Sequence, residues 1–250
     1  MTLPGAAAGN APSRSRAHRV AVVVPVLADR QALSALLSAL RAQAPAEVIV
    51  VSGRADPDMA ALCQEHGCLY LERAANRGAQ LDAGAHAASA PVIWFLHADV
   101  EPSPDALDAI EAAIAAGAES GCFRFAFQGS RTWYKRLLEA LVALRIRCGG
   151  VAYGDQGIFV RSDAYLACGG FAREPLFEEV RLVKRLRARG TFRVLAEPIR
   201  VSTRRWERDG WWYRTLHNRW LALRFALGAP PQALAASYRR LVRSGEEHER

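Results

Sequence analysis

The sequence predicts an α/β fold in which a mostly parallel sheet is flanked by helices and the second half of the chain is irregular. Short apolar runs alternate with segments whose apolar residues repeat at helical spacing. Strands separated by helix-length segments are typical of parallel strands joined by crossovers. Neither an internal repeat nor a long polar linker divides the 250 residues, so we expect a single domain.

The first half of the chain carries the parallel pattern. Its predicted strands are Val20–Val26, Glu47–Val51, Cys68–Glu72 and Pro91–Leu96. Its predicted helices are Gln31–Gln43, Asp58–His66, Arg77–Ala88 and Asp105–Ala116. The first helix places four leucines on one face, at positions i, i+3, i+4 and i+7: Leu33, Leu36, Leu37 and Leu40. Ser103 and Pro104 predict the start of the last helix, as N-cap and first-turn proline.

The pattern changes after residue 116. The predicted strands of this half are Cys122–Phe127, Gly157–Val160, Thr191–Leu195 and Ile199–Ser202. The predicted helices are Trp133–Arg145, Glu178–Arg189, which Gly190 ends, Trp211–Leu227 and Pro231–Val242. We expect residues 1–19 to be a disordered extension, 20–243 to form the domain and 244–250 to be a short tail.

The cysteines and the distribution of charge indicate the compartment and the partners of the protein. The five cysteines are odd in number and include no C-x-x-C pair, which indicates a reducing, cytoplasmic compartment. No apolar run approaches the roughly 20 residues of a spanning helix. Of the formal charge of +8, residues 1–19 hold +3 and residues 201–250 hold +5, so the body is neutral. We therefore expect no nucleic-acid partner, whereas the basic C-terminal segment is expected to contact an anionic membrane reversibly. The alternative is that this segment is a plain solvated surface.

Ligands of open parallel sheets bind outside the carboxyl ends of the strands. The candidates at the ends of the four predicted strands are Pro25 and Asp29, Ser52 and Arg54, Arg77, and His97 and Asp99. The sequence contains neither the glycine-rich dinucleotide motif nor a P-loop. Any phosphate must therefore be bound by other groups.

Asp99 is a candidate ligand for a hard divalent cation. It comes directly after an apolar strand and next to His97, where a cation could be held against a diphosphate. The alternative is that Asp99 and Glu101 only favour the start of the following helix.

Glu178 and Glu179 form an acidic pair at the start of a basic helix. One of them could be a general base, and the apolar lead-in Leu176–Phe177 would help to raise its pKa. The alternative is structural: both carboxylates stabilise the helix N-terminus, and Glu178 pairs with Arg181.

Two further pairs of polar residues are candidates for the site, and each also has a purely structural interpretation. Arg204 and Arg205 follow the last predicted strand, and guanidinium forks match diphosphate oxygens well, although surface arginines more often serve solubility. Asp155 and Gln156 lie within Gly154–Gly157, a segment that by itself predicts a turn.

Taken together in their order, these motifs make the chain resemble family 2 glycosyltransferases of the GT-A fold, which have a Rossmann-like sheet. Within the family the chain resembles the transferase subgroup found with radical-SAM and selenium-domain genes. The resemblance extends from about Val20 to about Tyr238. Its most specific pieces are residues 22–26, Arg77–Ala85, Phe95–Asp99, Gly154–Arg161, Gly169–Phe171 and Arg204–Glu207.

The resemblance implies an inverting transfer from a nucleotide-diphosphate sugar, assisted by Mg²⁺ or Mn²⁺, to an acceptor hydroxyl that the sequence does not identify. The basic C-terminal segment makes a lipid-linked acceptor one candidate. Residues 20–116 would bind the donor, and residues 117–243 would bind the acceptor and hold the base. Asp99 stands in the family's metal-binding signature, with His97 replacing its first acid, and Glu179 stands at the second, basic position of the family's acidic pair.

The other positions that the resemblance assigns to the nucleotide sugar are Pro25, Asp29, Ser52, Arg54, Arg77, His97, Asp155, Gln156, Arg204 and Arg205. The chain departs from the family at Ser52, where relatives carry an Asp that reaches the nucleotide base. The base therefore stays open. Asp29 stands where relatives often carry another acid near the nucleotide.

Two other functions fit the same sheet. A nucleotidyltransferase would attack a phosphate, but it normally needs a glycine-rich, basic loop after the first strand, which Pro25–Asp29 does not provide. A non-catalytic module that binds nucleotide sugars or membranes would keep the scaffold without the base. Ser52 favours the module, and Asp99 together with Glu179 favours the enzyme.

Overall fold

The structure is a computed structural model that describes residues 18–238, so most of the expected extension and all of the expected tail lie outside the described residues. The strands are β1 (Val20–Val26), β2 (Glu47–Ser52), β3 (Leu69–Glu72), β4 (Val92–Phe95), β5 (Val100–Pro102), β6 (Ser120–Phe127), β7 (Phe159–Arg161) and β8 (Phe192–Val201). The helices are α1 (Arg30–Gln43), α2 (Pro57–Glu65), α3 (Arg77–Ala87), α4 (Ala106–Ala115), α5 (Trp133–Arg147), α6 (Ser162–Ala167), α7 (Glu179–Arg189), α8 (Arg204–Asp209) and α9 (Trp211–Ala226), with a 3₁₀ turn, η1, at Gly154–Gln156.

The described strands form one mixed sheet in the order β3-β2-β1-β4-β7-β6-β8-β5. The first four are parallel, as the sequence predicts, and β6 and β8 are also parallel. Antiparallel pairing enters at β4–β7, β7–β6 and β8–β5, which makes the second half irregular. The reversal beside β4 leaves an opening beyond its carboxyl end, where open sheets bind ligands.

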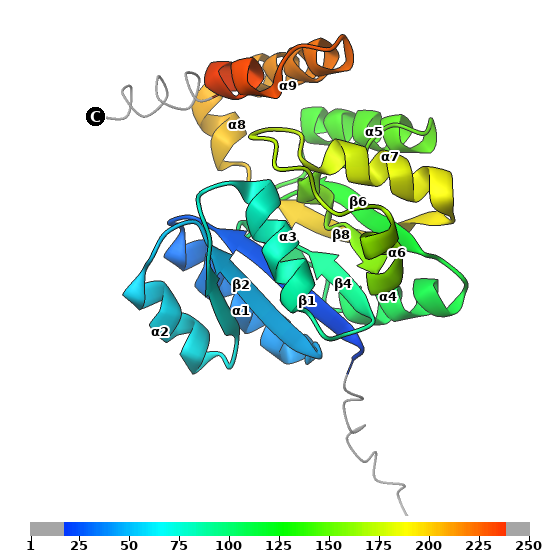
Figure 1. The fold of residues 1–250 in the computed structure, drawn as a ribbon. Coiled ribbons are helices and arrows are strands. Elements are labelled where there is room, and N and C mark those ends of the chain that lie inside the picture. The colour runs from blue at the N-terminus through cyan, green and yellow to red at the C-terminus, as the bar shows by residue number, and fades with distance from the viewer. Residues whose placement is uncertain (1–17, 239–250) are drawn as a thin grey trace, which may run out of the picture.

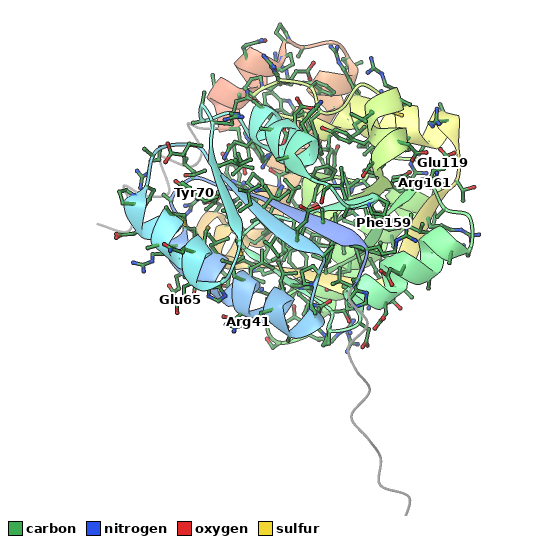
Figure 2. All side chains as sticks on the ribbon, turned by 60° about the horizontal axis from the view of Figure 1, so that its bottom comes forward. Arg41, Glu65, Tyr70, Glu119, Phe159 and Arg161 are labelled. Carbon is green, nitrogen blue, oxygen red and sulfur yellow. The ribbon has the colours of Figure 1, made fainter. Side chains whose placement is uncertain are left out.

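Helices cover both faces of the sheet (Figure 1). One face packs against α1, α2, α4 and α5, and alternate β1 residues point into it: Val20, Val22, Val24 and Val26. The other face packs against α3, α6 and α7. Side chains fill both layers, with Phe159 inside and Arg41 and Glu65 at the rim (Figure 2). Strand β1 is buried along its whole length, and burial on both faces explains why it is continuously apolar.

Helix caps set where the ligand-facing helices begin. The Asp29 carboxylate accepts a hydrogen bond from the Ala32 N–H at 2.9 Å at the start of α1. The Asn76 side chain does the same for the Ala79 N–H, also at 2.9 Å, at the start of α3. These caps fix the first turns of both helices at the carboxyl edge of β1 and β2.

The structure corrects several sequence-based boundaries. Helix α4 begins at Ala106 with Asp105 as N-cap, so Ser103 and Pro104 form a turn before it. The two expected returning strands are one strand, β8, whose pairing with β6 shifts register between Phe123 and Arg124. A chain bent by such an irregularity shows two apolar runs in the sequence although it does not leave the sheet.

The remaining differences lie near the ligand edge. Strand β7 begins at Phe159, because Gly157 has a positive φ of 58° and ends the 3₁₀ turn. Arg204 and Arg205 open the short helix α8, which the sequence does not predict, as it does not predict β5 or α6. The last expected helix is present at residues 231–238, and its remainder lies outside the described residues.

Candidate active site

Two adjoining cavities lie beyond the carboxyl ends of β1 and β4. The inner cavity, of about 180 Å³, extends under α8 and α9 and includes Glu179 and Asp155 in its lining. The outer cavity, of about 380 Å³, is bounded by the end of β1 and includes Pro25 and Asp29. Both cavities are lined by four sequence-predicted residues: Arg77, His97, Asp99 and Arg205. The topology thus brings together candidates from both halves of the chain.

Arg77 and Glu178 form an ion pair across this site. Arg77 begins α3, and Glu178 is the N-cap of α7. Gly78 permits the approach, since a Cβ at that position would lie 2.0 Å from the Ala172 carbonyl oxygen. Glu178 therefore pairs with Arg77, while Arg181, its alternative partner in the sequence, binds Glu174 at 2.9 Å.

Glu179 is the member of the acidic pair that lines the inner cavity. Its side chain is buried, its Oε1 accepts a hydrogen bond from the Gly154 N–H at 3.3 Å, and its Oε2 has no partner among the described residues. Burial and the neighbouring Glu178 carboxylate raise the pKa of Glu179 to about 8, although Arg77 opposes the shift. Glu179 thus retains a proton at a pH where an ordinary glutamate has lost it.

Phe177 holds the backbone just before this pair in an uncommon conformation. Its φ is +63°, in a region that bulky residues seldom occupy. Its ring packs against Phe225 of α9, with ring centroids 4.8 Å apart, and against Tyr153 at 5.9 Å. The packing on α9 holds Phe177 in this strained turn, which places Glu179 at the start of α7.

His97 and Asp99 are the groups that could hold a cation. Burial and Arg77 lower the pKa of His97 to about 4, so the imidazole is neutral at neutral pH and able to act as a ligand. Its buried Nε2 has no hydrogen-bond partner within the described chain. Residues 18–238 contain no group of three or more His, Cys, Asp or Glu side chains suited to a metal. Two protein ligands nevertheless fit Mg²⁺ or Mn²⁺ bound jointly with substrate phosphates.

Two arginines at the start of α8 face carboxylates on the sheet edge. Arg204 lies 3.6 Å from Asp29, and Arg205 lies 3.6 Å from Asp99, each distance measured between a guanidinium nitrogen and a carboxylate oxygen. All four side chains are at least a quarter exposed. Exposed ion pairs are weak, so either arginine can release its carboxylate and bind an anionic ligand instead. Arg205 also donates to the Tyr238 hydroxyl at 3.3 Å.

Four predicted donor-binding residues line neither cavity: Ser52, Arg54, Gln156 and Arg204, which pairs with Asp29. Ser52 is fully buried, and its hydroxyl donates to the Arg54 carbonyl at 2.7 Å. The Arg54 guanidinium pairs with Asp56 at 3.5 Å. Gln156 is buried and accepts a hydrogen bond from Arg145 at 3.2 Å. By contrast Asp155, next to Gln156, lines the inner cavity, and burial raises its pKa.

Sequence reasoning missed other residues of the site. Gln80 is buried and donates to the Val26 and Val51 carbonyls at 2.9 and 2.7 Å, which joins the carboxyl ends of β1 and β2. Its signal was its place within the Arg77–Ala85 motif. Tyr153 and Asn218 also line the inner cavity. An isolated Tyr and a helical Asn carry no comparable signal.

The mixed sheet with helices on both faces has the GT-A fold of solved glycosyltransferase structures. The match to a family sequence model shows that the protein is a glycosyltransferase. The chain belongs to glycosyl transferase family 2, whose sequence model matches residues 21–176. No curated protein sequence matches it.

Solved glycosyltransferase structures share the fold. Glucosyl-3-phosphoglycerate synthase from Mycobacterium tuberculosis, with Mn²⁺, UDP and glucosyl-3-phosphoglycerate, is 15% identical with a TM-score of 0.56, covering 72% of this chain and 70% of its own. The mannosyltransferase PcManGT from Pyrobaculum calidifontis, with GDP-Man and Mn²⁺, is 14% identical with a TM-score of 0.55, covering 75% and 57%. A fragment of S. aureus TarS, with UDP-GlcNAc, is 11% identical with a TM-score of 0.57, covering 73% and 58%.

Proposed function

We propose that the protein transfers a sugar from a nucleotide-diphosphate donor to an acceptor hydroxyl, with inversion at the anomeric carbon. One observation carries the proposal: the buried Glu179, with an unpartnered carboxylate oxygen among the described residues, lines the same cavity as Asp99 and Arg205. A base and groups suited to a diphosphate thus face one space. That arrangement supports direct displacement, in which the acceptor attacks the sugar while the diphosphate leaves.

Glu179 acts as the general base in this proposal. As the acceptor oxygen bonds to the anomeric carbon and the bond to the diphosphate breaks, the acceptor proton moves to a Glu179 carboxylate oxygen. The pKa of about 8 supports this role, because a base with a raised pKa takes up a proton more readily once it is ionised. Arg77 occupies Glu178 and leaves Glu179 as the carboxylate facing the acceptor.

The diphosphate would lie between the sheet edge and α8. Asp99 and His97 would hold Mg²⁺ or Mn²⁺, with substrate oxygens completing its coordination. Such an ion, when bound, neutralises charge that develops on the leaving diphosphate. Arg77 and Arg205 line the same cavities and would donate hydrogen bonds to phosphate oxygens.

In this proposal the first half of the chain binds the donor and the second half binds the acceptor. Residues 20–116 supply the outer cavity, with Pro25 and Asp29, for the nucleotide. Residues 117–243 supply Glu179, Asp155 and the acceptor side. The similar structures support this donor class, since those proteins were crystallised with UDP, GDP-Man or UDP-GlcNAc, two of them with Mn²⁺. The sequence motifs also support the radical-SAM- and selenium-domain-associated subgroup.

We also propose that the enzyme works in the cytoplasm and contacts anionic membranes reversibly through its basic C-terminal segment. Within the described part of the chain, no helix combines the length and apolar character needed to cross a membrane. The support for membrane contact is the composition of residues 201–243, which contain nine arginines and only two acidic residues. A lipid-linked acceptor would suit such a location.

Release of nucleoside diphosphate tests the reaction. The protein is incubated with Mn²⁺, a bacterial lipid extract as acceptor source, and UDP-, GDP-, CDP- and dTDP-sugars in turn, with Glu179→Gln as the matched control. We expect release from at least one donor by the parent, and much less by the variant. Release of pyrophosphate from nucleoside triphosphate and sugar phosphate would indicate a nucleotidyltransferase instead, and donor binding without any release would indicate a binding module.

A further inference from the structure

A groove runs between α5 and α9, outside the cavities described above. It has a volume of about 260 Å³ and is lined on one side by Leu138 and Val142 of α5 and on the other by Thr215 and Ala222 of α9. Phe127 of β6 is part of its apolar floor. Both helices lie at the same end of the molecule (Figure 1).

The groove leads to the inner cavity. Tyr153, Asp155, Trp206 and Asn218 line both spaces. A molecule whose hydroxyl reaches Glu179 in the inner cavity could therefore extend into the groove. Because most of the groove's walls and floor are apolar, the extending part would be an apolar chain.

Positive charge lies within the same groove. Arg145 and Arg219 line it, and neither has a carboxylate within 4.0 Å among residues 18–238. The Arg145 guanidinium stacks over the Tyr153 ring, 4.5 Å from its centroid, and its buried Nε has no hydrogen-bond partner in the described chain. Asp155 is the one acid among the described residues of the lining, and burial raises its pKa. An anionic group is therefore the complement of this end of the groove.

Exposed apolar residues lie on both helices that bound the groove. On α5 they include Trp133 and Leu144, 69% and 57% exposed, and on α9 they include Leu216 and Leu223, 66% and 58% exposed. Trp133 meets Trp212 of α9 with ring centroids 6.1 Å apart, so exposed aromatic residues of the two helices are in contact. Exposed apolar residues of this kind on two neighbouring helices fit a bilayer interface.

We propose that the groove between α5 and α9 is an acceptor subsite for a membrane-resident anionic lipid, whose chain lies between the helices and whose phosphate or carboxylate meets Arg145 and Arg219. The inference rests on the proposed function, since it assigns the acceptor of that reaction. It goes further by naming a chain-binding space, a charge and the helices that face the bilayer.

Calorimetric titration with dodecyl phosphate below its critical micelle concentration tests the groove. Ala222→Trp fills the groove, and Ala143→Trp, on an exposed position of α5 outside the groove, is its control. Arg219→Gln removes the charge, and Arg224→Gln, an exposed arginine outside the groove, is its control. We expect tenfold or greater loss of affinity in Ala222→Trp and about tenfold in Arg219→Gln, with both controls like the parent.

The other arms identify the ligand chemistry and its source. Inorganic phosphate and dodecyltrimethylammonium should each bind at least about tenfold more weakly than dodecyl phosphate, since each lacks one of the two matching features. The parent should sediment together with vesicles that contain phosphatidylglycerol. The double variant Leu216→Glu, Leu144→Glu should sediment with them less. Equal dodecyl phosphate affinity in Ala222→Trp and the parent, no dodecyl phosphate binding, or no pelleting would each overturn the proposal.

Nucleotide binding in the same variants separates this proposal from the proposed function. Ala222→Trp should bind nucleoside diphosphate and Mn²⁺ like the parent, because residue 222 lines neither donor cavity. If the parent binds dodecyl phosphate but no nucleoside diphosphate, the donor assignment fails while the groove stands.

Discussion

The Arg77 guanidinium pairs with the Glu178 carboxylate, although the two residues are 101 positions apart in the chain. The pair joins the first turn of α3 to the start of α7, and it distinguishes two adjacent acids that look equivalent in the sequence. Glu178 is occupied by the arginine, whereas Glu179 lines the inner cavity. This difference underlies the assignment of Glu179 as the base.

Substitution of each acid should therefore have a different effect. Glu179→Gln should lower turnover by roughly 10² or more and leave nucleoside diphosphate affinity near that of the parent. Glu178→Gln should instead lower the free energy of unfolding by about 2 kcal/mol, a moderate value because the Arg77 side chain is 40% exposed. Steady-state kinetics and urea denaturation of both variants measure the difference. Loss of turnover confined to Glu178→Gln would move the base by one position.

The pH dependence of activity should follow Glu179. Its carboxyl must be ionised to accept a proton, so kcat/KM should rise with pH through an apparent pKa of about 8. The measurement is a pH profile of nucleoside diphosphate release between pH 6 and 10. An activity plateau already reached at pH 6 would contradict the assignment.

The same group should affect stability. Its native pKa of about 8 lies above the ordinary 4.5, so between these values the native state binds more protons than the unfolded chain. The free energy of unfolding should therefore fall as pH rises through this window. Glu179→Gln should reduce this slope, which denaturation curves at pH 5, 7 and 9 would reveal. Equal slopes in parent and variant would show that another group titrates there.

Asp99 should control metal-dependent donor binding. Asp99→Asn keeps the size of the side chain but removes its charge, so it should weaken nucleoside diphosphate binding in Mn²⁺ about tenfold or more while the circular dichroism spectrum stays unchanged. Glu101→Gln, at an exposed acid that lines neither cavity, is the comparison variant and should bind like the parent. Unaltered affinity in Asp99→Asn would remove Asp99 from the metal site.

Gly78 should tolerate no side chain. A Cβ there would meet the Ala172 carbonyl oxygen at 2.0 Å and Glu178 Cβ at 3.1 Å, so Gly78→Ala must push α3 away from the start of α7. We expect a loss of about 1–3 kcal/mol in unfolding free energy and reduced turnover. Urea denaturation measures the first effect. Unchanged stability would contradict the prediction and would mean that the loop at Ala172 moves aside without a cost in free energy.

Membrane contact should depend on charge. Co-sedimentation with liposomes should increase with the fraction of anionic lipid and decrease with salt, because exposed charges are screened over about 8–10 Å at physiological ionic strength. Neutral phosphatidylcholine vesicles are the control. Absence of pelleting at low salt on strongly anionic vesicles would indicate a soluble or protein acceptor.

The sequence predicts the parallel half of the fold closely, and β1 is placed without error at Val20–Val26. Local periodicity suffices there, since each strand and helix buries a face of its own. The second half depends on long-range contacts. The register shift of β8 and the helix α8 follow from packing against β6 and the sheet edge, and short segments such as β5 carry too few residues for a pattern.

The site was predictable where residues follow strands. Arg77, His97 and Asp99 come together because the carboxyl ends of parallel strands share one edge. Ser52 and Gln156 also occupy motif positions, but their side chains are buried in hydrogen bonds to the protein itself, which spacing cannot reveal. The groove between α5 and α9 depends on two helices more than 60 positions apart, and no local pattern predicts their contact.

Calorimetry with nucleoside diphosphates tests the central claim most directly. UDP, GDP, ADP, CDP and dTDP are titrated into the full chain with Mn²⁺ and again with EDTA. At least one should bind in Mn²⁺, and its affinity should fall in EDTA and in Asp99→Asn but stay near normal in Glu179→Gln. No binding of any of the five in Mn²⁺ would contradict a nucleotide-sugar transferase at this site.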